Sequence, residues 1–290
     1  MEAKKTTTQV VMLGTGTPRP DPSRSGPATA IIAGGVPYLI DFGPGIVRRA
    51  AAAFEKGITA FGPCGANITT AFLTHMHSDH TVGYPDLILT PWVMGRREPL
   101  RVFGPRGIEA MTEHILQAWQ IDIAGRRGGH NGHNATGCTV DAHEIASGVI
   151  FQDGNVTVTA FAALHQEMAD SFSFRFDAGD RSIVISGDTA PTPAMLEYAR
   201  GCDLLVHEAY AMASYRAVSL QSQEFRRTHH TSSAELAAIA NAVRPKLLVI
   251  YHRSNAGRAP EALDSDEILL DEIRQSYAGP VVAAHDLDVY

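Results

Sequence analysis

A cluster of four potential metal ligands constrains this chain more than any other feature of its sequence. The segment His75–His80 reads HMHSDH and follows the apolar run Ile68–Leu73, which predicts a buried strand. In an extended segment, its first two histidines point to the same side and can bind one metal ion. If the chain then turns, its aspartate and its last histidine face a second position nearby. Imidazole and carboxylate groups suit Zn²⁺, with Fe and Mn as alternatives.

Four residues cannot fill two metal sites, so the sequence predicts further ligands at the ends of other strands. His165, Asp188 and His252 each come at or just after the end of an apolar run. Gly187 lets the backbone approach the site closely. Ligands at strand ends, along one edge of the sheets, form a preorganised cluster on rigid elements.

Short apolar runs alternate with Gly/Pro turns along the chain and indicate many strands with helices between them. The predicted strands are Gln9–Leu13, Ala28–Ala33, Tyr38–Asp41, Ile68–Leu73, Leu100–Phe103, Thr139–Glu144, Val156–Ala162, Ser171–Phe176, Ser182–Ile185, Leu204–Val206, Lys246–Ile250 and Val281–Ala284. The predicted helices are Ile46–Lys56, Leu87–Met94, Ile108–Gln120, Ala194–Ala199, Ser233–Val243 and Asp266–Ser276. Two halves of this kind predict two mixed sheets with helices outside them. No linker composition separates the halves, so we predict a single domain over residues 1–290.

Two polar features bear on substrate binding. The segment Asp122–Thr136 is rich in Gly, Arg, His and Asn, has no hydrophobic period, and is predicted as a loop, either a lid or a connection. Arginines occur as pairs at residues 96–97, 126–127 and 226–227, which predicts either a basic rim or solvated surface.

Composition excludes several classes of protein. The three cysteines are far apart and form no CxxC pair, which argues against a disulfide framework and a cysteine zinc site. No apolar run approaches the roughly 20 residues of a membrane-spanning helix. The segment Met1–Gln9 has no apolar stretch after its lysines, so it is no secretory signal. We therefore predict a cytoplasmic protein, while a leader removed beforehand stays an alternative.

The HxHxDH motif, the lone His165, the GDT triplet at residues 187–189 and the late His252 together resemble the metallo-β-lactamase superfamily. The resemblance implies an α/β fold, a four-layer αββα sandwich of two mixed β-sheets, over nearly the whole chain. It implies seven ligands for two Zn²⁺ ions: His75, His77 and His165 on the first, Asp79, His80 and His252 on the second, and Asp188 on both. It also implies hydrolysis by a hydroxide held between the ions, with Asp79 among the catalytic residues.

Two shorter motifs resemble ribonuclease Z, the tRNA 3′-processing branch of that family. They are HEA at residues 207–209, after a strand, and HTS at residues 230–232, before a helix. The resemblance implies that Glu208 and His230 form a proton-donating pair. A histidine held by a carboxylate stays protonated near neutral pH and can protonate a leaving oxygen. The alternative is a helix start with a solvated histidine, and His229 competes with His230 for the acid role.

Further stretches point to other branches or other roles. The loop Gly14–Pro18 resembles ribonuclease Z and predicts either a phosphate cradle or a turn between strands. Asp41 matches a family position that orients the ligand loop. The stretches Arg24–Pro27 and Asp41–Arg49 look more like arylsulfatase-like relatives, and Pro44 stands where ribonuclease Z usually has an acidic residue.

The spacing of two ligands sets the order of the functional hypotheses. Ribonuclease Z carries a tRNA-gripping arm between the lone histidine and the GDT aspartate, whereas only 22 residues separate His165 from Asp188 here, and the net charge is −7. We therefore predict a dinuclear zinc hydrolase of a phosphodiester, arylsulfate or related small anionic ester. A tRNA 3′-processing endoribonuclease without the arm is the alternative, and a β-lactam or lactone hydrolase is a further one. Nucleic acid is a less favoured partner, and a homodimer stays open.

Overall fold

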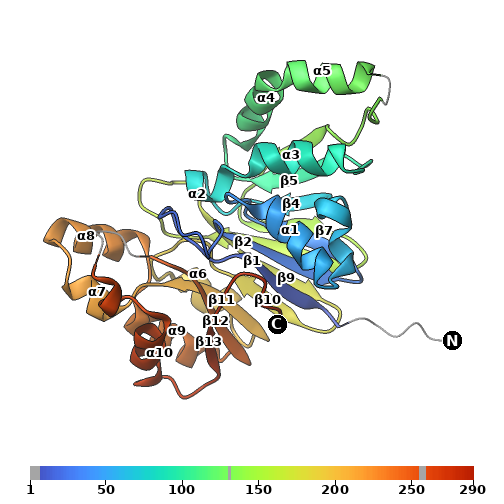
Figure 1. Ribbon diagram of the computed structural model, residues 1–290. Coiled ribbons are helices and arrows are strands. Elements are labelled where there is room, and N and C mark those ends of the chain that lie inside the picture. Colours follow the sequence, from blue (N-terminus) through green and yellow to red (C-terminus); the bar gives the residue numbers. More distant parts are fainter. Residues whose placement is uncertain (1–6, 130–131, 255–258) are drawn as a thin grey trace. The chain divides into compact units, whose positions relative to one another are not determined.

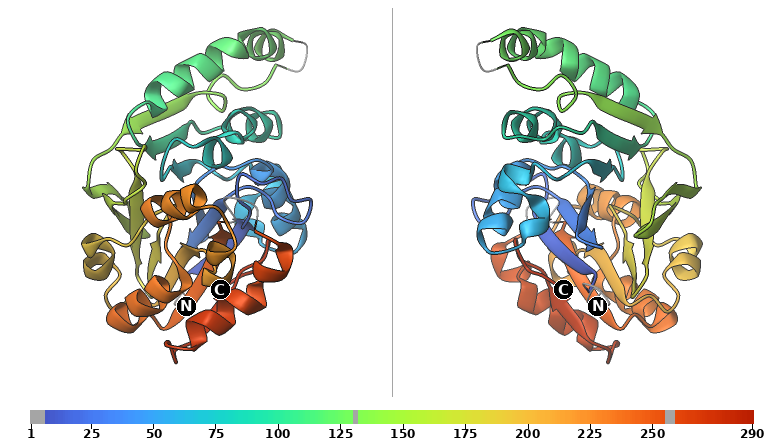
Figure 2. Two further views of the ribbon diagram at one scale, coloured as in Figure 1. Left: turned by 90° about the vertical axis from the view of Figure 1, so that its left-hand side faces the viewer. Right: turned by 90° about the vertical axis from the view of Figure 1, so that its right-hand side faces the viewer.

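The computed structural model describes residues 7–129, 132–254 and 259–290 (Figures 1 and 2). The chain forms two compact units, unit 1 (Met1–Ile145 with Asp286–Tyr290) and unit 2 (Ala146–His285). Each unit is built around one mixed β-sheet with helices beside it, which confirms the predicted α/β class with two mixed sheets. The single domain over residues 1–290 stays a prediction. Within the described ranges, no helix is long and apolar enough to cross a membrane.

Unit 1 contains a sheet whose strands keep their sequence order. Its strands are β1 (Gln9–Gly14), β2 (Ala28–Ala33), β3 (Val36–Ile40), β4 (Thr70–Phe72), β5 (Leu100–Gly104) and β6 (Val140–Glu144). The strands β1 to β3 pair antiparallel, whereas β3 to β6 pair parallel. Because parallel strands end on the same side, the residues that follow β3 and β4 meet at one edge of this sheet.

The helices of unit 1 are α1 (Ile46–Glu55), α2 (Ser78–Thr81), α3 (Tyr84–Val93), α4 (Ile108–Ala118) and α5 (Gln120–Gly128), with 3₁₀ turns η1 (Thr59–Phe61) and η2 (Pro63–Gly65). In α1, the buried residues Ile46, Ala50 and Ala53 recur at helical spacing. They share one apolar core with Leu87 and Trp92 of α3. Helices α4 and α5 form the outer edge of this unit, beyond α3 (Figures 1 and 2).

Two of the paired arginines are buried. Pro91 has no N–H group to donate to the carbonyl of Leu87, one turn earlier in α3. Arg96 is only 1% exposed, and its Nη1 donates to that carbonyl oxygen at 2.9 Å. Arg226, in unit 2, is also buried and donates from Nη1 to Oγ of Ser214 at 2.8 Å. These two arginines therefore brace the fold, and both the basic-rim and the solvated-surface interpretations are wrong for them.

Unit 2 contains the second sheet, in which β13, β12, β11 and β10 run parallel and β10, β9, β8 and β7 antiparallel. Its strands are β7 (Gly148–Gln152), β8 (Val156–Ala162), β9 (Phe172–Ala178), β10 (Ser182–Ile185), β11 (Leu204–Ala209), β12 (Leu247–Arg253) and β13 (Val281–Ala283). Its helices are α6 (Pro193–Tyr198), α7 (Met212–Arg216), α8 (Leu220–His229), α9 (Ser233–Val243) and α10 (Asp266–Arg274), with a 3₁₀ turn η3 (Glu261–Leu263). It follows that β8, β10, β11 and β12 all end at the same edge of the sheet.

The predicted loop over Asp122–Thr136 is wrong for its first half, which forms most of α5. The carboxylate of Asp122 accepts from Nε of Arg126 one turn later at 2.9 Å, and Ile123 packs against the core of unit 1. These contacts outweigh the glycine content that suggested a loop. Part of the predicted segment, residues 130–131, lies outside the described residues.

Candidate metal centre

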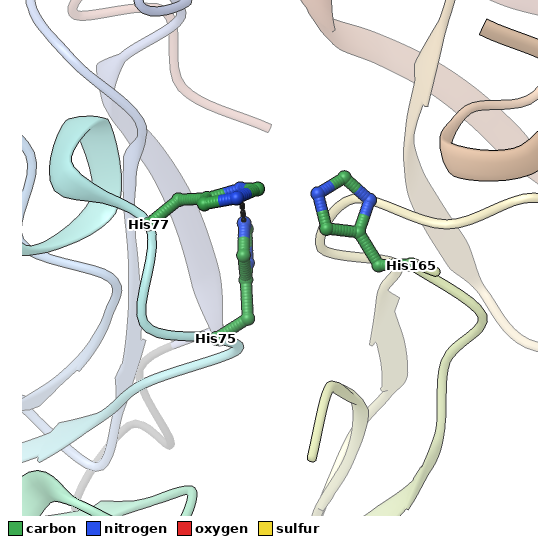
Figure 3. Close-up of side chains that lie close together, drawn as sticks. All are labelled: His75, His77 and His165. Atoms are coloured by element: carbon green, nitrogen blue, oxygen red, sulfur yellow. Dashed lines mark hydrogen bonds between the residues drawn. The ribbon is translucent and has the colours of Figure 1, made fainter. Parts of the chain in front are cut away.

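In unit 1, the HxHxDH motif leaves the carboxyl end of β4 and turns into the short helix α2. His75 and His80 are fully buried and Asp79 is nearly so, while His77 is half-buried. Nε2 of His75 lies 3.0 Å from Nδ1 of His77, with the two rings at a steep angle (Figure 3). Two nitrogens on one tetrahedral Zn²⁺, each at about 2.05 Å, would lie about 3.3 Å apart. This histidine pair therefore fits one ion, as the motif predicts.

A carboxylate beneath the motif sets the orientation of its rings. Asp41, in the left-handed backbone region at φ 58°, follows β3 and accepts from the backbone N and Oγ1 of Thr74 at 2.8 and 3.0 Å. Its Oδ2 also lies 2.8 Å from Nδ1 of His80. Since the Thr74 hydroxyl donates to Asp41, its oxygen accepts from Nδ1 of His75, 3.0 Å away. Both histidines therefore carry their proton on Nδ1 and keep Nε2 for a metal.

The second pair of the motif also brings two donors together. Nε2 of His80 lies 3.4 Å from Oδ2 of Asp79. An imidazole nitrogen and a carboxylate oxygen at this separation form a mixed donor pair of the kind that Zn²⁺, Fe and Mn accept. Asp41 thus serves as the support that the family resemblance implies, and its carboxylate holds residues on both sides of the motif.

In unit 2, the predicted residues lie at the ends of strands that finish on one edge of the sheet. His165 lies on the loop after β8 (Figure 3), Asp188 follows β10, and Glu208 lies near the end of β11. His252 lies in β12 at a β-bulge, because Glu208 pairs with Tyr251 and the next residue of β11 pairs with Arg253. Its φ of 42° lies in the left-handed region, which is uncommon for residues other than glycine. A bulge redirects a side chain, and the predicted end of this strand at Ile250 therefore came too early.

The carboxylate of Asp188 lies between two histidines of unit 2. Its Oδ1 is 3.4 Å from Nδ1 of His252, and its Oδ2 is 4.0 Å from Nδ1 of His230. Ligand atoms of His165, Asp188 and His230 all lie within 4.8 Å of one another. The same limit holds for Glu208, His230 and His252. The donors of unit 2 therefore lie close enough together to hold a cation. One oxygen of Asp188 lies toward His252 and the other toward His230.

Glu208 and His230, which the resemblance pairs as proton donors, lie within hydrogen-bond distance of each other. Nδ1 of His230 lies 3.2 Å from Oε1 of Glu208, which also accepts from the backbone N of Thr231 at 3.0 Å and of Thr189 at 3.3 Å. Glu208 is fully buried, and among the described residues its Oε2 has no hydrogen-bond partner. Burial, and next the charge of Asp188, raise the pKa of Glu208 well above its usual value. His230 is buried, so the solvated histidine of the alternative is wrong, although α9 does begin just after it with Ser232 as its N-cap.

His229 has a different role from its neighbour. Its backbone carbonyl accepts from Nδ1 of His165 at 2.9 Å, and its Nε2 lies 2.6 Å from Oε2 of Glu167. Sequence reasoning missed both His229 and Glu167 as support for a ligand. No local signal marks them, because the contact joins segments more than 60 residues apart.

At Gly14–Pro18, the hydrogen bonds favour the predicted turn between strands over the predicted phosphate cradle. The backbone N–H of Thr15 donates to Oδ1 of Asp286 at 3.0 Å, and that of Ser25 donates to Oδ2 at 2.7 Å. The N–H of Gly16 donates to the carbonyl of Ser25. Within the predicted cradle, the amide of Thr15 is therefore taken by a carboxylate and that of Gly16 by a carbonyl, both of the chain itself.

Comparisons with known proteins point to the same family as the motifs of the sequence. A model of the beta-lactamase superfamily domain matches residues 38–253. The ribonuclease Z of Mycobacterium bovis is 32% identical over 247 residues, which are 84% of this chain and 85% of that protein. The ribonuclease Z of Mycobacterium sp. strain KMS is 35% identical over 246 residues, 84% of this chain and 83% of that protein.

Two solved structures share the fold over almost the whole chain. The metallo-β-lactamase fold protein YhfI from Bacillus subtilis has a TM-score of 0.70 at 17% identity, and covers 98% of this chain and 100% of its own. The short form of human tRNase Z has a TM-score of 0.67 at 22% identity, and covers 97% of this chain and 98% of its own.

Proposed function

This chain belongs to the metallo-β-lactamase superfamily, in its ribonuclease Z-like branch, and we propose that it cleaves a phosphodiester bond at the 3′ end of precursor RNA. That it is a metal-dependent hydrolase follows from this membership. The RNA substrate is the second of the hypotheses raised by the sequence, and the curated relatives favour it over small esters. These relatives are of similar length to this chain and carry the ribonuclease Z name. The contact between Glu208 and His230 is the structural observation that supports the proposal most directly.

The imidazole and carboxylate donors described in the two units support two Zn²⁺ ions in this proposal. One ion would be held by His75, His77 and His165, the other by Asp79, His80 and His252, with Asp188 shared by both. When bound, such ions supply positive charge and lower the pKa of a coordinated water to about 7. Imidazole and carboxylate donors suit zinc, and they also accept Fe and Mn.

The residues of the chain itself would orient the ligands and move one proton. Asp41 and Thr74 hold the rings of His75 and His80. When His230 is protonated, it donates from Nδ1 to Oε1 of Glu208 and holds a second proton on Nε2. This proton goes to the oxygen that leaves when the phosphorus–oxygen bond breaks.

A small phosphodiester or arylsulfate is the second candidate substrate, because of what lies between two ligands. The stretch from His165 to Asp188 holds only a turn, β9 and β10, and carries no arm that could grip tRNA. Burial of Arg96 and Arg226 also removes two cations that an RNA-binding rim would use.

A direct comparison of substrates tests the proposal. The kcat/KM values for a precursor tRNA, bis(p-nitrophenyl) phosphate, an aryl sulfate, a lactone and a β-lactam are measured at one ionic strength. We expect site-specific 3′ cleavage of the precursor at a kcat/KM far above those of the small substrates. Efficient turnover of one small ester, with the precursor left intact, would overturn the proposal in favour of that ester.

A further inference from the structure

We propose that His229 and Glu167 are positioning residues that hold the ring of His165 in its ligating orientation. The inference rests on the proposed metal role of His165 and goes beyond it, since neither residue belongs to the predicted ligand set or to the Glu208–His230 pair. All the contacts that carry it lie within unit 2.

The first contact determines which nitrogen of His165 is protonated. Nδ1 of His165 lies 2.9 Å from the carbonyl oxygen of His229, and a carbonyl can only accept. The proton of the neutral ring therefore resides on Nδ1, and Nε2 carries the lone pair that a metal requires. The ring of His165 also stands nearly perpendicular to the ring of His229, with centroids 5.0 Å apart.

The position of the His229 carbonyl in the fold strengthens its hold on the Nδ1 proton of His165. His229 is the last residue of α8, where helix carbonyls lack an intrahelical donor and the helix dipole places partial negative charge. An acceptor of this kind draws the proton of Nδ1 and makes Nε2 a more basic ligand. The terminus of α8 thus does for His165 what Asp41 does for His80.

The second contact holds this carbonyl in place. Nε2 of His229 lies 2.6 Å from Oε2 of Glu167, two residues after His165. On its other side, Nδ1 of His229 lies 2.8 Å from the carbonyl of Phe225, whose ring stacks on the imidazole at 4.1 Å. The loop after β8 and the end of α8 are therefore joined twice, through the ring of His165 and through the carboxylate of Glu167.

The experiment measures Zn²⁺ affinity on purified apoprotein by competition with a chromophoric chelator, for His229→Ala, His229→Gln and Glu167→Ala. Glu224→Ala is the matched control, because it removes an exposed ion pair with Arg227 on the same helix. We expect His229→Ala to weaken one of the two zinc sites, by less than the about 10–100-fold that loss of a partner behind a ligand costs, because the carbonyl stays and only the side chain that anchors it is removed. His229→Gln keeps an N–H for Glu167 and should recover part of this loss. The exposed position of Glu167 limits its own effect to about 2–5-fold.

Zinc affinities equal to wild type in both His229 variants would overturn the inference. So would an equal loss at both zinc sites, or the same loss in Glu224→Ala, because either indicates a general effect on folding. Circular dichroism of each apoprotein checks that the fold is intact. The proposed function fails separately, because it is tested by cleavage of precursor tRNA by the wild-type protein.

Discussion

The two units assemble their parts of the candidate centre in opposite ways. In unit 1, all four predicted ligands come from one run of six residues, His75–His80, between β4 and the end of α2. In unit 2, the predicted residues come from separate strand ends and a helix junction between His165 and His252. A contiguous motif is set by one loop, whereas a dispersed set depends on the order and direction of strands.

The groups that hydrogen-bond to the predicted site residues also differ between the two units. In unit 1, a single side chain, Asp41, holds both Thr74 and His80. In unit 2, backbone groups do this work, because Glu208 accepts from backbone amides and His165 donates to the carbonyl of His229. A side-chain support can be removed by one substitution, whereas a backbone support can only be shifted. This difference leads to the following predictions.

The largest expected effect tests whether the two sets act as one centre. His77→Ala, in unit 1, and Asp188→Ala, in unit 2, should each lower kcat/KM by at least about 10³-fold, because a metal supplies several kcal/mol of charge stabilisation. Elemental analysis should show less zinc in both variants. Asp141→Ala removes an exposed carboxylate of β6 and serves as the control. Retention of full activity by either ligand variant would show that its unit does not contribute to the centre.

The next effect concerns the proton donor, which has no counterpart in unit 1. His230→Ala should slow cleavage of substrates with alkoxide leaving groups by about 10²–10⁴-fold, because general-acid help is needed only for a basic leaving oxygen. Cleavage of nitrophenyl esters should change little, and zinc content should not change. His114→Ala, at an exposed position on α4, is the control. Equal losses for both kinds of leaving group would remove His230 from the acid role.

The same contrast explains what could be predicted from the sequence. The strand β8 and the helix α9 have their predicted bounds because their apolar residues recur at the period of the element, and β2 has its predicted bounds because it is a short buried run. The donors of His75–His80 were found because they are neighbours in sequence. Asp188 and His252 were predicted at strand ends, and parallel pairing brings those ends to one edge.

Three features could not be predicted, each for a physical reason. Helix α8 is polar and buries only Arg226 and His229, so it has no apolar period. The bulge at His252 depends on pairing with β11 and leaves no local mark. The contact between Glu167 and His229 depends on how α8 ends, which no residue near Glu167 reveals.

A smaller effect concerns the side-chain support of unit 1. Asp41→Asn should weaken Zn²⁺ binding by about 10–100-fold, because an amide cannot accept both from Thr74 and from His80 in the way the carboxylate does. Thr74→Val should cost less, since Thr74 supports only His75 directly. Chelator competition on the apoproteins measures both, with Asp86→Asn on α3 as the control. A loss no greater for Asp41→Asn than for Asp86→Asn would show that unit 1 does not depend on this carboxylate.

The smallest expected effect concerns stability. It compares β4, which precedes the motif of unit 1, with β11, which carries Glu208 in unit 2. The residues of β4 before the motif are uncharged, whereas β11 carries the fully buried His207 beside Glu208, and burial lowers the pKa of His207 to about 4. The unfolded chain binds this proton first, below about pH 6.5, so the free energy of unfolding falls as pH falls from there toward 4. Lowering the pH from about 8 to about 5 should therefore reduce the free energy of unfolding by about 2 kcal/mol through this residue alone.

His207→Asn keeps a donor for the carbonyl of Glu208 but has no group that titrates in this range. Urea unfolding followed by circular dichroism at the two pH values should therefore give a smaller loss of stability in the variant than in the wild type, by about 2 kcal/mol. His114→Asn, at an exposed position on α4, is the control. Parallel pH dependence in wild type and His207→Asn would mean that His207 is protonated in the folded chain as readily as in the unfolded one. The strand β11 would then make no pH-dependent contribution of its own to stability, like the uncharged strand β4 that precedes the motif of unit 1.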